Sequence, residues 1–243
     1  MILNRNKLIF PESNIFLHHK CLIAYILLLI LIEGCSSPGL KDKIETGIVE
    51  FDISYTNNSG RNFPVQLLPK TIEMKFNNNF ASYTIEDRVG LFSICNILDL
   101  NDHLSHTLIK VFDKKYVYHG PPKETPIFFK NKNPYIVKYL SDTMRVAGVL
   151  CKKANITDTE TSKTFEILYT SSFNIQDINN NTPYEKIKGV LLQFDIQMKN
   201  LGMKLTAKKI EQQDIKDQDF RIPKGYKLIT KKQMEEIINT LLP

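Results

Sequence analysis

Hydrophobic and polar residues alternate along most of the chain beyond residue 43, which is the pattern of β-strands with one buried face. In the first such run, 47–55, the side chains of Val49, Phe51, Ile53 and Tyr55 fall on one face. Further runs follow at 71–76, 80–85, 92–98, 104–112 and 115–118. Asparagines at 77–79 supply turn residues between the second and third runs. This part of the chain is therefore predicted to form consecutive antiparallel strands.

The second half contains two predicted hairpins, separated by a loop at 171–188. The first joins runs 146–157 and 164–170 through a polar connection. The second joins 190–198 and 203–212 through a turn at 200–202, and its first strand alternates most regularly in the chain. The apolar residues that share one face of this strand and become candidate lining residues are Leu192, Phe194, Ile196 and Met198.

Proline-rich breaks and one helix complete the pattern. Segment 120–126 and the region around Pro134 interrupt the strand pattern. After a short predicted strand at 220–222, Thr230 is a suitable N-cap for a helix over 231–242, whose apolar residues recur at helical spacing. The prediction is a mainly β fold: a single strongly curved antiparallel sheet, or half-barrel, with a C-terminal helix.

The N-terminal region has the organisation of an export signal. Basic residues (Arg5, Lys7, Lys20) precede an apolar run at 21–32, which is too short to span a bilayer core but suits the hydrophobic region of a signal peptide. An uncleaved anchor helix and an ordinary secretory signal remain alternatives. Each of the three interpretations places the later residues outside the cytoplasm.

Residues 31–35, Leu-Ile-Glu-Gly-Cys, resemble the lipobox of bacterial lipoproteins, except for the acidic residue at its centre. The resemblance implies a signal peptide over 1–34, lipidation of Cys35, a tether over 35–43 and a folded domain over 44–243. The N-terminal lipid would attach the protein to the membrane, so the membrane is an expected partner. The uncharged Ser36 is compatible with the outer membrane, so the expected location is the cell envelope, lipid-anchored and facing the periplasm.

Two later segments carry a second resemblance. Residues 148–154 (Gly-Val-Leu-Cys-Lys-Lys-Ala) with 165–170 (Phe-Glu-Ile-Leu-Tyr-Thr) are similar to a hairpin of the lipoprotein-carrier-like half-barrel proteins, and the GLPGLI-related families are the nearest in pattern. Segments 189–194, 203–210 and 220–226 follow in the same order and spacing. Leu168 stands where the family pattern has an aromatic residue. The resemblance implies a curved sheet whose apolar concave face binds acyl chains.

Composition narrows the range of functions. Removal of residues 1–34 from the 243-residue chain leaves 209 residues, within the range of one domain. The formal net charge of the whole chain is +6, but its lysines are interspersed with acidic residues and form no stripe. This distribution argues against nucleic acid as a partner. Cys95 and Cys151 either form one disulfide or remain buried thiols, since both lie in apolar strand-like runs.

Candidate catalytic and metal-binding residues are few. His103 and His106 lie near Asp99 and Asp102, but the two histidines point to opposite faces of an extended segment. Glu50 and Asp52 are a possible pair of catalytic carboxylates. Simple exposure of both acids on the surface of a strand would explain the pair equally well. Because no nucleophile elbow, phosphate loop or zinc-protease motif occurs in the sequence, we expect no catalytic residues, no metal and no cofactor.

Three hypotheses about function remain. The first is non-catalytic binding of an apolar ligand or acyl chain in the concave sheet. The second is a structural or interaction lipoprotein, whose concavity is filled by its own side chains and which contacts an envelope protein. The third is a hydrolase or metal-dependent enzyme. The alternating residues at 192–198 are more simply explained as core than as ligand-lining, because every half-buried strand alternates.

Overall fold

The computed structural model describes residues 43–56, 68–87, 89–129, 135–159, 161–198 and 201–241. The chain from Asp42 onward forms one compact unit. The strands of the described residues are β1 (Gly47–Tyr55), β2 (Thr71–Phe76), β3 (Phe80–Glu86), β4 (Phe92–Asp99), β5 (Leu104–Val111), β6 (Lys114–Gly120), β7 (Tyr135–Val146), β8 (Val149–Asp158), β9 (Thr164–Thr170), β10 (Val190–Met198), β11 (Leu201–Gln212) and β12 (Lys227–Leu228). A 3-10 helix, η2 (Asp217–Phe220), precedes β12, and an α-helix, α2 (Lys231–Leu241), follows it.

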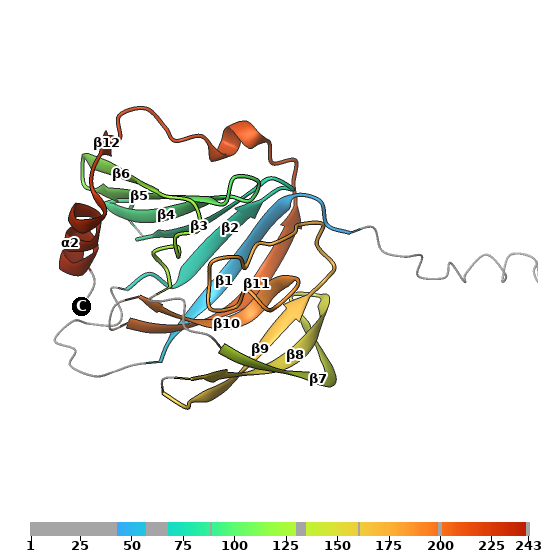
Figure 1. Cartoon of the computed structure of the whole chain (residues 1–243). Helices are drawn as coiled ribbons and strands as arrows, with labels where there is room; N and C mark the ends of the chain where they lie inside the picture. Colours follow the sequence, from blue (N-terminus) through green and yellow to red (C-terminus); the bar gives the residue numbers. More distant parts are fainter. Residues whose placement is uncertain are drawn as a thin grey trace, which may run out of the picture. The chain divides into compact units, whose positions relative to one another are not determined.

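All the described strands belong to one sheet, ordered β12-β6-β5-β4-β3-β2-β1-β11-β10-β9-β8-β7. Strands β2 to β6 form one antiparallel meander and β7 to β11 a second. Strand β1 joins them, because it pairs with β2 on one side and with β11 on the other (Figure 1). Only β12 is parallel to its neighbour. The predicted mainly β fold with an open, curved sheet and a C-terminal helix is confirmed.

Three irregularities in the ladder accompany the curvature. The pairing register shifts between β1 and β11 at Glu50/Phe51, where Lys208 of β11 is the extra residue, between β10 and β9 at Leu191/Gln193, and between β7 and β8 at Tyr139/Thr143. An extra residue in one strand bends that strand and increases the local twist. The strands accordingly change direction across the sheet, as Figure 1 shows between β4 and β8.

Two segments and the helix α2 cover the inner face of the sheet, which is the face that bears Val49 and Phe51. One segment is 121–129, between β6 and the residues before β7, and the other is 171–189, between β9 and β10 (Figure 1). They add apolar side chains to the same core cluster as the sheet. The buried residues that they and α2 contribute are Phe128, Phe173, Ile175, Ile178, Tyr184, Ile187, Met234 and Ile238. The concavity is therefore filled by the protein itself.

The outer face is covered at one end by the chain that follows β11. Ile97, Leu108 and Val117, from β4 to β6, pack against Ile215 and Phe220. The predicted strand at 220–222 is wrong, because Phe220 lies in η2. The reason is local capping: the carboxylate of Asp219 accepts a hydrogen bond from the backbone N–H of Lys216, which bends the chain into a turn.

The terminal helix, described over 231–241, agrees with the predicted 231–242 to within one residue. Thr230 Oγ1 accepts from the backbone N–H of Gln233, while the Gln233 side chain accepts from the N–H of Thr230, a reciprocal capping box. Met234 and Ile238 are buried, as the apolar stripe predicts. Contacts with β6 hold the helix, and the Lys231 ammonium lies 2.7 Å from a Glu124 carboxylate oxygen.

Strand β7 was not predicted from the sequence. It is the last strand of the sheet, and most of its side chains are exposed, among them Ile136 and Met144. An edge strand that is mostly solvated and carries a register shift has little reason to alternate. The predicted break at Pro134 lies outside the described residues.

Both cysteines of the folded domain are free thiols. Cys95 lies on β4 and Cys151 on β8, and six strands separate these two in the sheet order. Of the two alternatives for this pair, the structure shows free thiols and not the disulfide; Cys151 is buried and Cys95 is partly buried.

Candidate functional site: an apolar pocket beneath the covering segments

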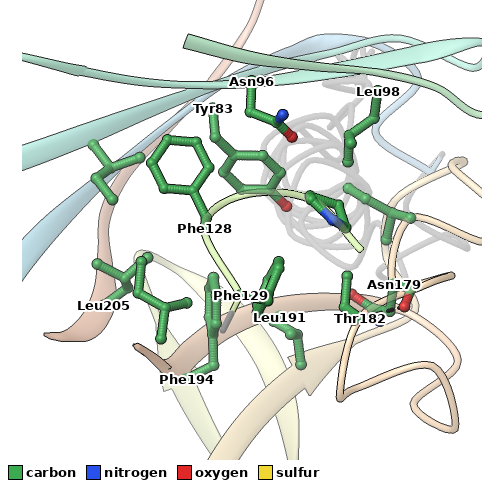
Figure 2. A pocket seen from close by; sticks show the side chains of 14 residues that line it. Tyr83, Asn96, Leu98, Phe128, Phe129, Asn179, Thr182, Leu191, Phe194 and Leu205 are labelled. Atoms are coloured by element: carbon green, nitrogen blue, oxygen red, sulfur yellow. Dashed lines mark hydrogen bonds between the residues drawn. The ribbon is translucent and has the colours of Figure 1, made fainter. Parts of the chain in front are cut away.

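A small pocket lies between the inner face of the sheet and the two covering segments (Figure 2). Its walls come from β2 to β4, from β10 and β11, and from both segments. The lining residues are Ile72, Tyr83, Asn96, Leu98, Pro126, Phe128, Phe129, Ile178, Asn179, Thr182, Leu191, Phe194, Ile196 and Leu205. The cavity has a volume of about 20 Å³, which is room for roughly one water molecule.

The four predicted lining residues are all buried, but they do not all reach this pocket. Phe194 and Ile196 form part of its wall, whereas Leu192 and Met198 pack elsewhere in the core. Leu191 lies in the wall although strict alternation assigns it to the opposite face. The register shift between Leu191 and Gln193 explains the difference, since it breaks the two-residue period at Leu192. Ligand binding by these residues stays a prediction.

Asn96 is the most unusual residue of the pocket wall. It lies on β4 with 0 % of its surface exposed, and its side-chain N–H groups donate to Ser105 Oγ at 3.0 Å and to Thr107 Oγ1 at 3.2 Å on β5. Its carbonyl oxygen, Oδ1, has no hydrogen-bond partner. A buried acceptor without a partner is costly and rare, so this oxygen marks a place where a polar group from outside would be stabilised.

Tyr83 adds a second polar group from the neighbouring strand β3. Figure 2 shows its ring beside Asn96, within the pocket. Burial raises the pKa of this tyrosine, so the hydroxyl stays protonated at neutral pH and is able to donate a hydrogen bond.

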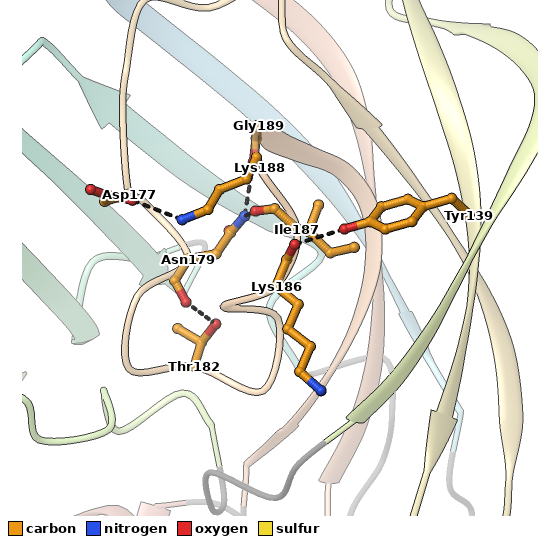
Figure 3. A network of polar contacts seen from close by, with 8 residues as sticks. All are labelled: Tyr139, Asp177, Asn179, Thr182, Lys186, Ile187, Lys188 and Gly189. Carbon is orange, nitrogen blue, oxygen red and sulfur yellow. Dashed lines mark hydrogen bonds and ion pairs between the residues drawn. The ribbon is translucent and has the colours of Figure 1, made fainter.

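The covering segment 171–189 is held by hydrogen bonds of its own (Figure 3). The Asn179 side chain donates to the carbonyls of Ile187 and Gly189, each at 2.8 Å, and Thr182 Oγ1 donates to the carbonyl of Asn179. Gly189 closes the segment at φ +134°, where a Cβ would lie 2.4 Å from the backbone oxygen of Thr170. Only glycine fits this position without a shift of backbone.

Tyr184 connects this segment to the sheet. Beyond Gln193, β10 no longer pairs with β9, and the Tyr184 hydroxyl occupies the opened edge. It donates to the carbonyl of Asp195 at 2.5 Å and accepts from the N–H of the same residue at 3.3 Å. Its ring packs edge-on against Phe194 with centroids 5.9 Å apart. One side chain thus replaces a missing strand neighbour and forms part of the cover.

A second, polar pocket adjoins the first and shares three of its residues, Leu98, Pro126 and Ile178. We call it the polar mouth. Its other lining residues are Asp99, Leu100, His103, Leu104, Ser105, Glu124, Asp177, Asn180 and Asn181. Three of these are acidic, so oxygen acceptors dominate the polar mouth.

In the part of the chain that the structure describes, the histidines and acids considered from the sequence do not gather into a group of three or more that could hold a metal ion. His103 lines the polar mouth, whereas His106 faces His119 on β6 with their Nδ1 atoms 3.0 Å apart. Burial, followed by the neighbouring His119, lowers the pKa of His106, and Asp99 opposes this shift. Glu50 and Asp52 form ion pairs with Lys208 at 3.4 and 3.7 Å, which explains that acidic pair as a surface feature.

Cys35, the predicted lipidation site, lies outside the described residues, as do the predicted signal peptide and most of the predicted tether. In the described ranges no helix has both the length and the apolar character needed to cross a membrane.

Sequence reasoning missed Asn96, Tyr83 and the covering residues Phe128 and Phe129. One signal was present, because Asn96 interrupts the apolar run of β4 at a position that faces the core. An amide there requires partners. No comparable signal identifies Phe128 or Phe129, since their segment has no period.

No protein-family model matches the chain, and no curated protein matches it. The resemblances to lipoprotein export signals and to half-barrel lipid carriers therefore stay predictions from the residues themselves.

Proposed function

We propose that this protein is a cell-envelope lipoprotein, anchored through Cys35, whose half-barrel domain binds an apolar ligand without catalysis. The proposed binding site is the pocket between the inner face of the sheet and segments 121–129 and 171–189. The proposal combines the export signal predicted from the sequence with the geometry of that pocket.

The observation that carries the proposal is the unpartnered Oδ1 of Asn96 in the wall of an otherwise apolar pocket. Small-molecule sites are mostly apolar and contain a few placed polar groups. The amide N–H groups of Asn96 are bound to Ser105 and Thr107, whereas packing alone gives no reason for an unpartnered acceptor in this wall. The combination supports a binding site over a purely structural core.

The present pocket is too small for an acyl chain, so the covering segments must move when a ligand enters. Among the described residues, segment 121–129 has one backbone bridge to β10, between Phe129 and Gln197, and is otherwise held by the buried Phe128 and by Glu124, which pairs with Lys231. Phe129 itself is only partly buried. Displacement of this segment would open the apolar wall formed by Phe194, Ile196 and Leu205. We propose that this displacement accompanies binding.

Native mass spectrometry with lipid extraction tests the proposal on the full-length protein purified from a bacterial envelope. Reproducible bound lipid is the expected result. Phe129→Asp places a charge in the pocket wall and should abolish the adduct. Phe112→Asp is the matched control, because Phe112 is 64 % exposed and is absent from the residues that line the pocket. A bare protein mass in every preparation, or equal loss in both variants, would contradict ligand binding at this site.

A second candidate function, contact with an envelope protein, is favoured by the edge strand β7. It ends the sheet and exposes Ile136 and Met144, next to the exposed Leu150 of β8. An exposed edge with apolar side chains is suited to pairing with a strand from another chain. If no lipid is found, the variants Ile136→Lys and Met144→Lys would test this edge by loss of a defined complex.

A further inference from the structure

We infer that the pocket selects an amphiphile whose polar end donates hydrogen bonds and carries no negative charge, such as a long-chain alcohol or amine. This inference rests on the proposed function and concerns the same pocket. It specifies the chemistry of the ligand head, whereas the apolar walls specify only its tail.

The first step is the chemistry of Asn96. Both of its N–H groups point toward β5, where Ser105, Thr107 and the backbone carbonyl of His106 accept hydrogen bonds from them. Only Oδ1 remains, and a carbonyl oxygen accepts but cannot donate. A ligand group that satisfies it must therefore carry an O–H or N–H. An ether or an ionised carboxylate has no proton to offer to this oxygen and would find a partner only in the Tyr83 hydroxyl, which donates.

The second step is the polar mouth beside the pocket. Asp99, Glu124 and Asp177 line it together with His103, and its described lining includes neither lysine nor arginine. Lys231 neutralises Glu124 at 2.7 Å and Lys188 neutralises Asp177 at 3.1 Å from outside the mouth.

Asp99, which also lines the mouth, differs from these two acids: its Oδ1 accepts from the backbone N–H groups of Asn101 and Asp102, with no lysine or arginine paired to it among the described ion pairs. An anionic head entering here would meet like charge, whereas a neutral or cationic head would not.

A single water at Asn96 is the competing explanation, since the closed pocket has room for about one. If the ligand only filled apolar space, that water would stay in place. The affinity would then not depend on the head group of the ligand. The two explanations therefore differ in one measurable respect, the dependence of affinity on a donor in the ligand.

The experiment compares ligands of equal chain length on the full-length protein: 1-dodecanol, dodecyl methyl ether, dodecylamine and dodecanoate. Displacement of the neutral fluorescent probe N-phenyl-1-naphthylamine at pH 7.5 reports each affinity. The expected order is alcohol and amine about tenfold tighter than the ether, as one satisfied hydrogen bond allows, with dodecanoate weakest. Because the alcohol and the ether are compared on the native protein, this part needs no variant.

Two variants locate the effect. Asn96→Leu removes the acceptor and should equalise alcohol and ether. Asp99→Asn should strengthen dodecanoate relative to the alcohol and leave the difference between alcohol and ether unchanged. If Asn96→Leu does not fold, the native comparison still decides.

The outcomes separate the inference from the proposed function. Equal binding of all four ligands would keep the apolar site and overturn the selection of the head group. Tightest binding of dodecanoate would also overturn it. If none displaces the probe and the protein carries no lipid, the proposed function fails and the inference fails with it.

Discussion

Removal of one hydroxyl, in Tyr184→Phe, should destabilise the protein far more than the loss of a typical hydrogen bond. The ring stays, with its edge-on contacts to Phe194 and Phe129. The variant loses only the hydroxyl oxygen, which hydrogen-bonds both the C=O and the N–H of Asp195. At this residue β10 no longer pairs with β9. Tyr184 is only 1 % exposed, so water does not readily replace the hydroxyl.

The expected loss follows from leaving a backbone donor and a backbone acceptor without partners. Each unsatisfied buried group costs about 1–3 kcal/mol, and the strand edge is partly solvated, so we expect a total of about 2–4 kcal/mol. With a urea m-value of about 2 kcal/mol/M for a domain of this size, the unfolding midpoint should fall by about 1–2 M. Far-UV circular dichroism of the full-length protein in urea measures this shift.

Tyr139→Phe is the matched control. The Tyr139 hydroxyl also donates to a backbone carbonyl, that of Lys186 at 2.7 Å, but Tyr139 is 53 % exposed. Water can replace that bond, so the cost should be below about 1 kcal/mol. Equal destabilisation by the two variants would refute the reasoning that Tyr184 substitutes for a strand neighbour of β10.

Three further predictions concern other parts of the fold. Gly189→Ala should cost about 3 kcal/mol or more in urea unfolding, since a Cβ there strikes backbone; Gly148→Ala, at φ +82° with open space around it, should cost only about 1–2 kcal/mol. His119→Gln should raise the pKa of His106 in an NMR titration, because a neighbouring positive charge is removed; an unchanged pKa would contradict coupling of the pair. Burial raises the pKa of Cys151 to about 11, so this thiol should react with Ellman's reagent at pH 8 only after unfolding; fast reaction in the native protein would contradict its burial.

Local pattern was sufficient for most of the strands. β1 has the predicted boundaries, the hairpins of β2 with β3 and of β10 with β11 form as predicted, and α2 begins at the predicted cap. These elements bury one face against a core, so their side chains must follow the period of the backbone. β7 was not predicted because it is an edge strand. The strand predicted at 220–222 was wrong because side-chain capping within a few residues overrode the alternating triplet Phe-Arg-Ile.

The candidate site was predictable only in part. Alternation correctly identified Phe194 and Ile196 as wall residues. It predicted Leu192 where the structure has Leu191, because a register shift changes which side chain faces the pocket. A shift of this kind depends on how β9 and β10 pair, and the sequence of one strand does not contain that information.

The sequence by itself determined the mainly β fold, the terminal helix and the apolar face of β10, because period and capping are properties of neighbouring residues. Tertiary structure alone decided how the concavity is occupied. Segments 121–129 and 171–189 have no regular period, and their side chains are buried through contacts with distant strands. The same contacts leave Asn96 Oδ1 without a partner in the pocket wall. Whether a polar atom in a strand is satisfied depends on every element packed around it, and only the folded chain brings those elements together.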